Sequence, residues 1–204
     1  MKRSDVKALY YICHIENLPS IIEEGILCYN KAKKLKPETI YNPDVQERRK
    51  NKLIPFGRTG KKLHDYANLY FNPRNAMMSA IRDRHTEICV LPIDASILDL
   101  AGVIVSDRNA SSDYVRFHSS KYLEPLNEEL IFAKDWTHPD PIEYFRRKSA
   151  VCAEVLVPNF VPSNFIIGVY VSCNESCQKV KSLLAGSSLQ DSVFIDNDLF
   201  FQWG

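Results

Sequence analysis

Hydrophobic positions in this chain gather in short runs rich in β-branched and aromatic residues, a pattern typical of strands. In several of these runs apolar side chains alternate with other residues, as they do along a strand with one buried face. We expect strands over 9–14, 88–93, 103–105, 148–158, 165–172, 193–195 and 199–203, and a turn leading into a strand over 63–72.

Between these runs, apolar residues recur at helical spacing, and residues typical of helix ends stand beside them. Asn17 is a candidate N-cap, Pro19 falls in the first turn and Gly25 is a candidate helix end. Further helices are expected over 44–52, 122–132, 141–148 and 175–184, and one opening at Pro73. Strands and helices follow one another without regular β-α alternation, so the predicted fold class is α+β.

Residues 29–63 show little periodicity and much charge. The one helix expected there spans 44–52, and the rest is predicted to be loop. So long a stretch of irregular chain in one domain is usually functional or mobile.

Glu154 is the one charge in the apolar run 151–157. Alternation predicts Val151, Ala153, Val155 and Val157 on one face of a strand, with Glu154 on the other. A buried carboxylate costs several kcal/mol unless it is paired or hydrogen-bonded. Two interpretations stand: a catalytic or ligand-binding carboxylate on a rigid strand, or an edge strand whose outer face is wet.

The chain has 204 residues, of which 45% are hydrophobic, which suits a single domain over residues 1–204. Its apolar runs fall short of the ~20 residues of a membrane span, so no membrane partner is expected. Six cysteines lie mostly in apolar runs without a Cys-x-x-Cys spacing, so we expect a cytoplasmic protein with reduced thiols. Candidate metal ligands are scattered, and no metal site is predicted.

Charge is unevenly distributed along the chain. Residues 1–62 hold 14 Lys and Arg against 7 Asp and Glu, a balance of +7, and the rest holds 12 against 18, a balance of −6. The basic residues of this first part gather at Lys31, Lys33, Lys34, Lys36, Arg48, Arg49, Lys50, Lys52, Arg58, Lys61 and Lys62. A charge run of this kind is commonly a solvated loop, and it also suits binding to the phosphates of a nucleic acid or a dinucleotide.

Beyond Glu154, a few polar and aromatic positions could take part in chemistry. His14 follows a predicted strand directly, and an arginine at 48 or 49 could bind a pyrophosphate with two parallel hydrogen bonds. Aromatic faces at Tyr66 and Tyr70 could stack on a nicotinamide or a base, although core packing is the ordinary role of such residues. His64, Asp65 and Arg108 lie at predicted turns.

The chain lacks a G-x-G-x-x-G motif and a Walker A motif, and it shows no Ser-His-Asp or Cys-His order. One strand carboxylate, one loop arginine and several aromatic residues suit a reaction with a cationic, sugar-centred transition state. A carboxylate can hold ribose hydroxyls and stabilise positive charge at the anomeric carbon.

Four segments of the chain resemble the DarT family of NAD-dependent DNA ADP-ribosyltransferase toxins. They are 10–18 with 25–27, 45–49, 63–78 and 147–158, and 105–109 is a weaker fifth. The segment 63–78, Leu-His-Asp-Tyr-Ala-Asn-Leu-Tyr-Phe-Asn-Pro-Arg-Asn-Ala-Met-Met, is the most specific of them. Their order and spacing hold over nearly the whole chain.

This resemblance implies an ADP-ribosyltransferase-like split mixed β-sheet with NAD+ between its halves. It further implies transfer of ADP-ribose to thymine or guanine in single-stranded DNA, with release of nicotinamide. No metal is implied, and the expected partner is an antitoxin that removes ADP-ribose, often a macrodomain protein. The alternatives are another acceptor, RNA or protein, and a non-catalytic nucleic-acid-binding module.

By position, the resemblance makes Glu154 and Arg49 catalytic and assigns NAD+ contacts to Tyr11, His14, Asn17, Arg49 and Tyr70. The candidate DNA-binding residues are His64, Asp65, Tyr66, Arg74, Arg108 and Lys148. Two positions depart from the family pattern: Tyr11 stands where many relatives have histidine, and Cys152 stands two residues before the glutamate.

Overall fold

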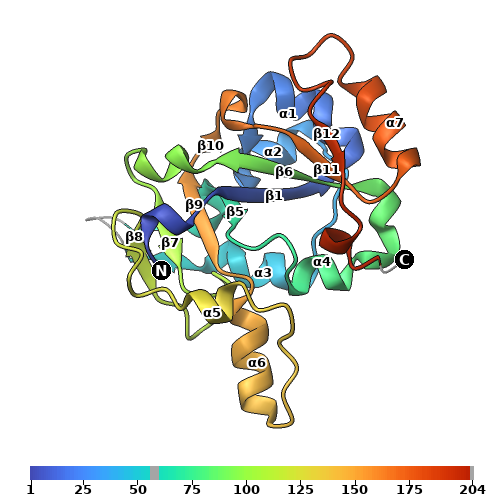
Figure 1. Cartoon of the computed structure of the whole chain (residues 1–204). Coiled ribbons are helices and arrows are strands. Elements are labelled where there is room, and N and C mark those ends of the chain that lie inside the picture. Colours follow the sequence, from blue (N-terminus) through green and yellow to red (C-terminus); the bar gives the residue numbers. More distant parts are fainter. Residues whose placement is uncertain (56–59, 203–204) are drawn as a thin grey trace.

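The chain folds around a mixed eight-stranded sheet in a computed structural model that describes residues 1–55 and 60–202 (Figure 1). In spatial order, its strands are β12 (Val193–Ile195), β11 (Val169–Val171), β6 (Ile88–Asp94), β1 (Ala8–His14), β5 (Tyr66–Tyr70), β9 (Glu154–Pro158), β7 (Ile104–Ser106) and β8 (Phe117–Ser119). Two small ribbons accompany it, β2 (Ile26–Leu27) with β10 (Phe160–Val161) and β3 (Leu53–Ile54) with β4 (Lys61–Lys62). The expected α+β class is confirmed.

The sheet consists of two halves that meet at its centre. Strand β1 pairs with β6 along its whole length, from Ala8 opposite Asp94 to His14 opposite Ile88. Its pairing with β5 is confined to Tyr10 opposite Tyr70. Beyond this pair of residues the two halves of the sheet separate. The expected split sheet is therefore confirmed, and side chains have room between β1 and β5.

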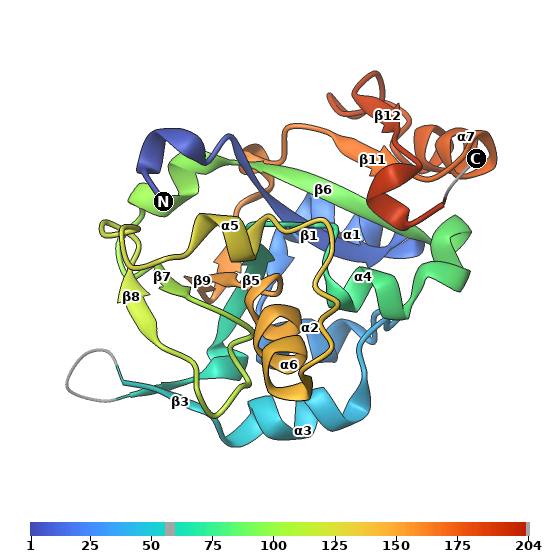
Figure 2. The same cartoon turned by 60° about the horizontal axis from the view of Figure 1, so that its bottom comes forward.

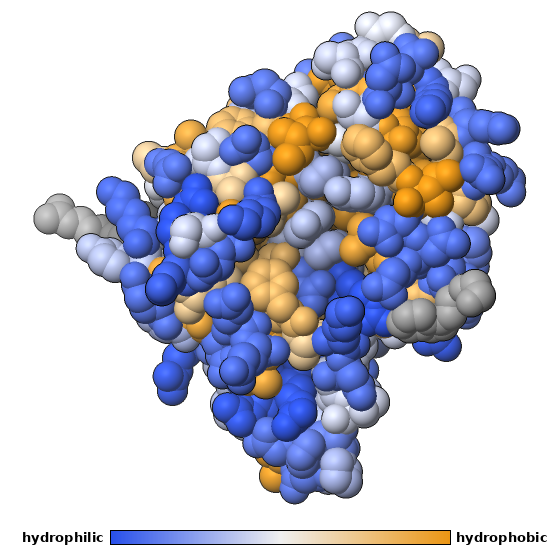
Figure 3. All heavy atoms as spheres, viewed as in Figure 1, coloured by the Kyte–Doolittle hydropathy of each residue, from blue (hydrophilic) through white to orange (hydrophobic). Residues whose placement is uncertain are grey.

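The helices are α1 (Leu18–Glu24), α2 (Tyr29–Ala32), α3 (Pro43–Asn51), α4 (Ala76–Ala80), α5 (Glu128–Ile131), α6 (Pro141–Ala150) and α7 (Asn174–Leu183). Figure 2 shows α2, α3, α4 and α6 gathered around one side of the central strands, while α7 lies beside β11 and β12. Helix α6 lies on a projection from the body of the molecule, and the visible surface of this projection is mostly hydrophilic (Figures 1 and 3).

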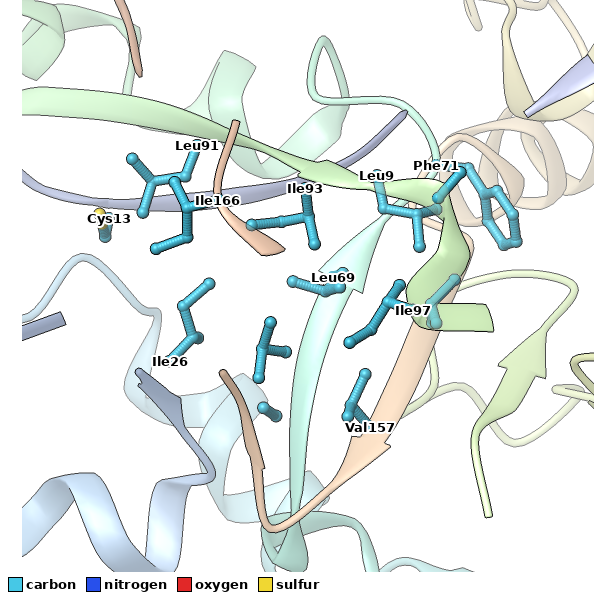
Figure 4. Packing of buried hydrophobic residues seen from close by; sticks show 14 of the residues in the cluster. Leu9, Cys13, Ile26, Leu69, Phe71, Leu91, Ile93, Ile97, Val157 and Ile166 are labelled. Atoms are coloured by element: carbon cyan, nitrogen blue, oxygen red, sulfur yellow. The ribbon is translucent and has the colours of Figure 1, made fainter. Parts of the chain in front are cut away.

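The main core lies against one face of the sheet. On β5 it takes Ala67 and Leu69, and on β9 it takes Val155 and Val157, so alternate residues of both strands point the same way. In Figure 4 the side chains of Leu9, Leu69 and Val157 point into this common interior. Fully burying one aliphatic side chain stabilises a fold by about 1.5–3 kcal/mol, so this face is the main source of stability.

The opening strand, turn and helix agree with the sequence prediction, with one difference in detail. Pro19 lies in the first turn of α1, and Gly25 ends the helix with φ +80° against the Val161 carbonyl, where a Cβ would clash. Asn17 stands at the N-cap position but its side chain makes no capping bond. Instead it pairs with the backbone of Glu38, at 2.8 Å to the carbonyl and 3.0 Å from the amide.

Several predicted elements differ from the structure. The helix expected to open at Pro73 begins at Ala76, the strand expected over 165–172 is confined to β11, and the expected loop 29–63 also contains α2, β3 and β4. Three further differences are larger. The strand expected over 148–158 begins only at Glu154, because α6 continues to Ala150, and Val151 packs in a different cluster from Val155. The helix expected over 122–132 is the short α5, whose Asn127 cap fixes a late start. The expected closing strand 199–203 is a 3-10 helix at Asp198–Phe200, and Trp203 lies outside the described residues.

Candidate active site

A cleft of about 1180 Å³ opens on the face of β5 and β9 opposite the main core. Its walls come from the end of β1, the segment through α1 and α2, helices α3 and α4, the loop 109–114 and α6. Sites for small molecules commonly occupy about 300–1,000 Å³, so this cleft has room for a dinucleotide and part of a second substrate.

Glu154 and Arg49 form a buried ion pair at the floor of this cleft. Arg49 Nη1 donates to Glu154 Oε1 at 2.9 Å, and Nη2 donates to Oε2 at 3.0 Å. The glutamate is 0% exposed, and Arg49, which lines the cleft, covers it. Of the two interpretations of Glu154, the wet edge strand is therefore wrong: β9 is an inner strand between β5 and β7.

The loop after β7 also holds the carboxylate. The Ala110 amide donates to Glu154 Oε1 at 2.9 Å, so among the residues that the structure describes Oε1 has two donors and Oε2 has one, Arg49. Burial by itself would lower the pKa of Arg49, but the Glu154 carboxylate outweighs burial and raises that pKa. These bonds hold the Glu154 side chain in a place without solvent exposure, where electrostatic interactions are stronger than in water.

Tyr70 and Cys152 lie next to this pair. Tyr70 stands opposite Glu154 on the neighbouring strand, and its hydroxyl donates to the Met77 sulfur at 3.2 Å. Burial, followed by the Glu154 charge, raises the pKa of Tyr70 well above its usual value. Burial also raises the pKa of the Cys152 thiol to about 11, so Cys152 is a neutral side chain at neutral pH.

The other residues expected to contact NAD+ also line the cleft: Tyr11, His14 and Asn17. His14 ends β1, and its Nδ1 accepts the Glu16 amide at 3.2 Å, which fixes the ring orientation. The structure thus brings together all five residues that the resemblance assigns to NAD+, although they come from three separate segments of the chain.

The expected DNA-binding residues fall into two groups. His64, Tyr66 and Lys148 line the cleft. His64 stacks on Tyr29, with ring centroids 4.1 Å apart, and contacts Gln46 of α3 at 3.1 Å. Burial, then the charge of Arg49, lowers the pKa of His64.

The remaining three of these residues are not among the residues that line the cleft, and each has partners in the protein. Asp65 accepts from Asn30 at 2.7 Å. Arg74 donates to the carbonyl oxygens of Asp198 and Lys134 and lies over the Phe201 ring. Arg108 pairs with Asp107 through two nitrogens, at 3.1 and 3.0 Å.

The basic segment reaches the cleft in part. Its members that line the cleft are Lys33, Lys36, Arg48 and Arg49. Lys52 donates to the Ser112 carbonyl at 2.8 Å and so ties the end of α3 to the loop 109–114. Arg58 lies outside the described residues.

Sequence reasoning missed many polar and aromatic residues that line the cleft, among them Asn68, Asn109, Tyr114, Phe145 and Ser149. Asn68 could have been found, because alternation along 66–70 puts it on the same face as Tyr66 and Tyr70. Tyr114 and Phe145 are 81% and 65% exposed, and no periodic pattern distinguishes them in the sequence.

Within residues 1–55 and 60–202, no three His, Cys, Asp or Glu side chains are grouped so that they could hold a metal ion. In the same residues no helix is long and apolar enough to cross a membrane.

A split mixed sheet with a buried glutamate and a cationic cleft defines an ADP-ribosyltransferase-type fold and site. Comparison with known proteins is more specific. The family model described as "DarT: ssDNA thymidine ADP-ribosyltransferase, DarT" matches residues 10–201. The chain belongs to the DarT family, so the expected class, NAD-dependent DNA ADP-ribosyltransferase, is confirmed.

The relatives and solved structures agree with this assignment. A DNA ADP-ribosyl transferase of Thermus sp. (strain 2.9) is 31% identical over 90% of this chain and 91% of its own length. Solved structures of Thermus sp. 2.9 DarT superimpose with TM-scores of 0.81, in complex with ADP-ribosylated ssDNA, and 0.78, in complex with NAD+. Both cover 96% of this chain and 97–98% of the solved chain, at 27% and 25% identity.

A relative from Thermosipho africanus (strain H17ap60334) is a DNA ADP-ribosyl transferase-DNA ADP-ribosyl glycohydrolase fusion protein. It is 28% identical over 96% of this chain, but the match spans only 50% of the fusion protein. The chain described here therefore corresponds to about half of that relative.

Proposed function

We propose that this chain transfers ADP-ribose from NAD+ to a thymine base in single-stranded DNA, with Glu154 as the catalytic carboxylate. The observation that supports this most is the buried Glu154–Arg49 pair at the floor of a large cleft. A charged pair is a poor way to stabilise a core, since an apolar pair of similar volume commonly does as well or better. Its cost is explained if the carboxylate serves catalysis.

In this proposal NAD+ takes the place of Arg49 at Glu154. Oε1 keeps the Ala110 amide, and Oε2 becomes free to accept a hydroxyl of the nicotinamide ribose. The bond between the ribose C1 and the nicotinamide nitrogen breaks, its electron pair leaves with neutral nicotinamide, and positive charge develops on the ribose. The fixed carboxylate stabilises that charge, an electrostatic effect that is large in a site without water.

The released guanidinium of Arg49 is expected to turn toward the pyrophosphate, with Arg48 on the same helix as a second cation. Tyr70 packs on the nicotinamide, while Tyr11, His14 and Asn17 surround the nicotinamide ribose. These assignments explain why polar residues from β1, α3 and β5 meet in one cleft.

The acceptor base enters from the side of the loop 109–114 and α6. There Tyr114 and Phe145 present exposed rings beside Lys148, which suits a strand whose bases stack and whose phosphates need cations. The unstacked base attacks C1 of the ribose through its ring nitrogen, and the proton on that nitrogen passes to solvent water at the mouth of the cleft. His64 and Tyr66 are proposed to contact this strand inside the cleft, and Asp65, Arg74 and Arg108 could meet it only outside.

A partner that removes ADP-ribose fits a toxin of this kind. The Thermosipho relative joins a transferase to a DNA ADP-ribosyl glycohydrolase. We propose that such an activity, in an antitoxin of macrodomain type, opposes this chain. Residues 1–204 are proposed to be one transferase domain, because a single sheet spans the described part of the chain from β1 to β12.

Labelled NAD+ tests the proposed function. The purified chain is incubated with a mixture of thymine-containing single-stranded DNA, the same DNA with every thymine replaced by cytosine, duplex DNA, RNA and protein. Label on the first oligonucleotide alone supports the proposal, and label on the thymine-free oligonucleotide points to guanine. Label on RNA or protein, or DNA binding without nicotinamide release, would replace it with one of the rival functions.

A further inference from the structure

Ser106 touches the backbone of the candidate catalytic residue from the neighbouring strand. Strands β7 and β9 pair at Ile104 with Leu156 and at Val105 with Val155. One step further, where Ser106 faces Glu154, the Glu154 amide donates to the Ser106 hydroxyl at 3.0 Å. Both residues are 0% exposed, so neither amide nor hydroxyl has water as an alternative partner.

The same hydroxyl also begins the loop that reaches the Glu154 side chain. Ser106 Oγ donates to the Arg108 carbonyl at 2.7 Å, which turns the chain directly after β7. Two residues later the Ala110 amide donates to Glu154 Oε1 at 2.9 Å. One side chain therefore fixes the main chain of Glu154 directly and its carboxylate through a four-residue arc.

Two bonds that do not involve Ser106 also hold this loop, one of them inside the arc and one beyond it. The Asn109 amide donates to the Ser149 carbonyl at 2.9 Å, and Lys52 holds the Ser112 carbonyl at 2.8 Å. The loop can therefore keep its general course without Ser106, which adds the direct link between the start of this loop and the Glu154 backbone.

We propose that Ser106 is a positioning residue for the transfer reaction, because its hydroxyl sets both the backbone and the carboxylate of Glu154. This inference rests on the proposed role of Glu154. It predicts a loss in kcat rather than in NAD+ binding, because the residues proposed to hold NAD+ are unchanged. A misplacement of about 1 Å in a catalytic group can cost on the order of 10²-fold in rate.

Ser106→Ala is the first variant, and Ser120→Ala is its matched control. Ser120 is also buried, and its hydroxyl donates to the Leu98 carbonyl at 2.6 Å, away from Glu154. Both variants lose one buried hydroxyl hydrogen bond, so both are expected to lose some thermal stability. Ser106→Cys keeps the shape of the side chain but bonds weakly, so it separates packing from hydrogen bonding.

The kinetic readout is labelling of single-stranded DNA below the unfolding temperature of every variant. We expect Ser106→Ala to lower kcat by about 10–100-fold with KM for NAD+ changed less than about threefold. Ser106→Cys is expected to fall between Ser106→Ala and wild type, and Ser120→Ala to keep the wild-type kcat. A kcat for Ser106→Ala no lower than that of Ser120→Ala would overturn the proposal.

Hydrogen exchange gives a second readout that does not need activity. The Glu154 amide is expected to exchange faster in Ser106→Ala than in wild type or Ser120→Ala, since it loses its acceptor. Unchanged exchange at Glu154 would also overturn the proposal. A wild-type chain that labels no DNA would refute the proposed function instead, and the exchange result would then decide the role of Ser106 alone.

Discussion

The two faces of strands β5 and β9 use neighbouring residues for opposite purposes. One face carries Leu69 and Val155, both fully buried among other hydrophobic side chains. The other carries Tyr70 and Glu154, which face Arg49 and the cleft. Apolar burial on the first face stabilises the fold, and burial of a charged pair on the second face offsets part of that stabilisation.

This contrast shows why the charged pair needs so many supports. The apolar face tolerates substitution by side chains of similar size and shape, because apolar contacts do not depend on direction. The cleft face depends on direction: two guanidinium nitrogens and one amide donate to the Glu154 carboxylate, and the Glu154 amide donates to the Ser106 hydroxyl. Changes on the two faces should therefore separate loss of stability from loss of activity.

The largest effect on stability is expected from Arg49→Ala, which leaves the Glu154 carboxylate buried and unpaired. Removing one partner of a buried pair costs about 3–5 kcal/mol in the free energy of unfolding. Denaturant unfolding measures it, and Arg48→Ala on the exposed side of the same helix is the control, expected within about 0.5 kcal/mol of wild type. The double variant with Glu154→Ala should lose less than the two single losses added together, and strict additivity would contradict the pairing.

Glu154→Gln is expected to lower kcat for DNA labelling by on the order of 10²–10³-fold, the usual cost of removing one fixed group that stabilises transition-state charge. The amide keeps the size of the side chain but cannot offset positive charge on the ribose. Labelling is measured below the unfolding temperature, with the exposed Glu175→Gln on α7 as control. A rate within about threefold of wild type would remove Glu154 from the mechanism.

Val155→Ala tests the opposite face one residue further along β9. Loss of two buried methyl groups is expected to cost about 2 kcal/mol of unfolding free energy. The kcat should stay at the wild-type value at temperatures where the variant is folded, because Val155 points away from the cleft. A fall in kcat comparable with that of Glu154→Gln would show that the two faces are not separate.

The smallest effect is a pH dependence at His64, whose pKa burial lowers. Below about pH 6.5, the ordinary histidine pKa, the unfolded chain binds a proton that the folded chain resists. Stability from this group is therefore lost as pH falls from about 7 toward 5. We expect the melting temperature of His64→Gln to change less than that of wild type over this interval, and equal slopes would assign the dependence to other groups.

Much of the fold could be predicted from the sequence because its signals are local. Alternation identified Glu154 as an isolated charge in a strand, and Pro19 with Gly25 bounded the first helix. The pairing of Glu154 with Arg49 could not be derived in this way, because the two residues lie 105 positions apart in the sequence. The basic residues indicated an arginine at 48 or 49, and the resemblance assigned NAD+ contact to Arg49 without a link to Glu154. The roles of Ser106 and Ala110 depend on how β7 meets β9, which no local pattern encodes.

The predicted start of the strand over 148–158 is wrong because helix α6 runs into this segment. The run 151–157 is apolar throughout apart from Cys152 and Glu154, so it resembles one continuous strand. Its first residues complete the turn after α6 and pack beside Tyr70 in a separate cluster. Hydrophobic residues that pack on two different sides of the sheet follow one another in the sequence, so they resemble a single strand.

A structure with bound NAD+ tests the central claim most directly. A carbocyclic NAD+ analogue that cannot release nicotinamide is suited to it, and the quantity to measure is the distance between the Arg49 guanidinium and the Glu154 carboxylate. We expect the pair, now 2.9 and 3.0 Å apart, to be broken, with Glu154 Oε2 on a hydroxyl of the nicotinamide ribose. An intact Arg49–Glu154 pair beneath a fully bound dinucleotide would contradict the claim that this carboxylate acts on the ribose.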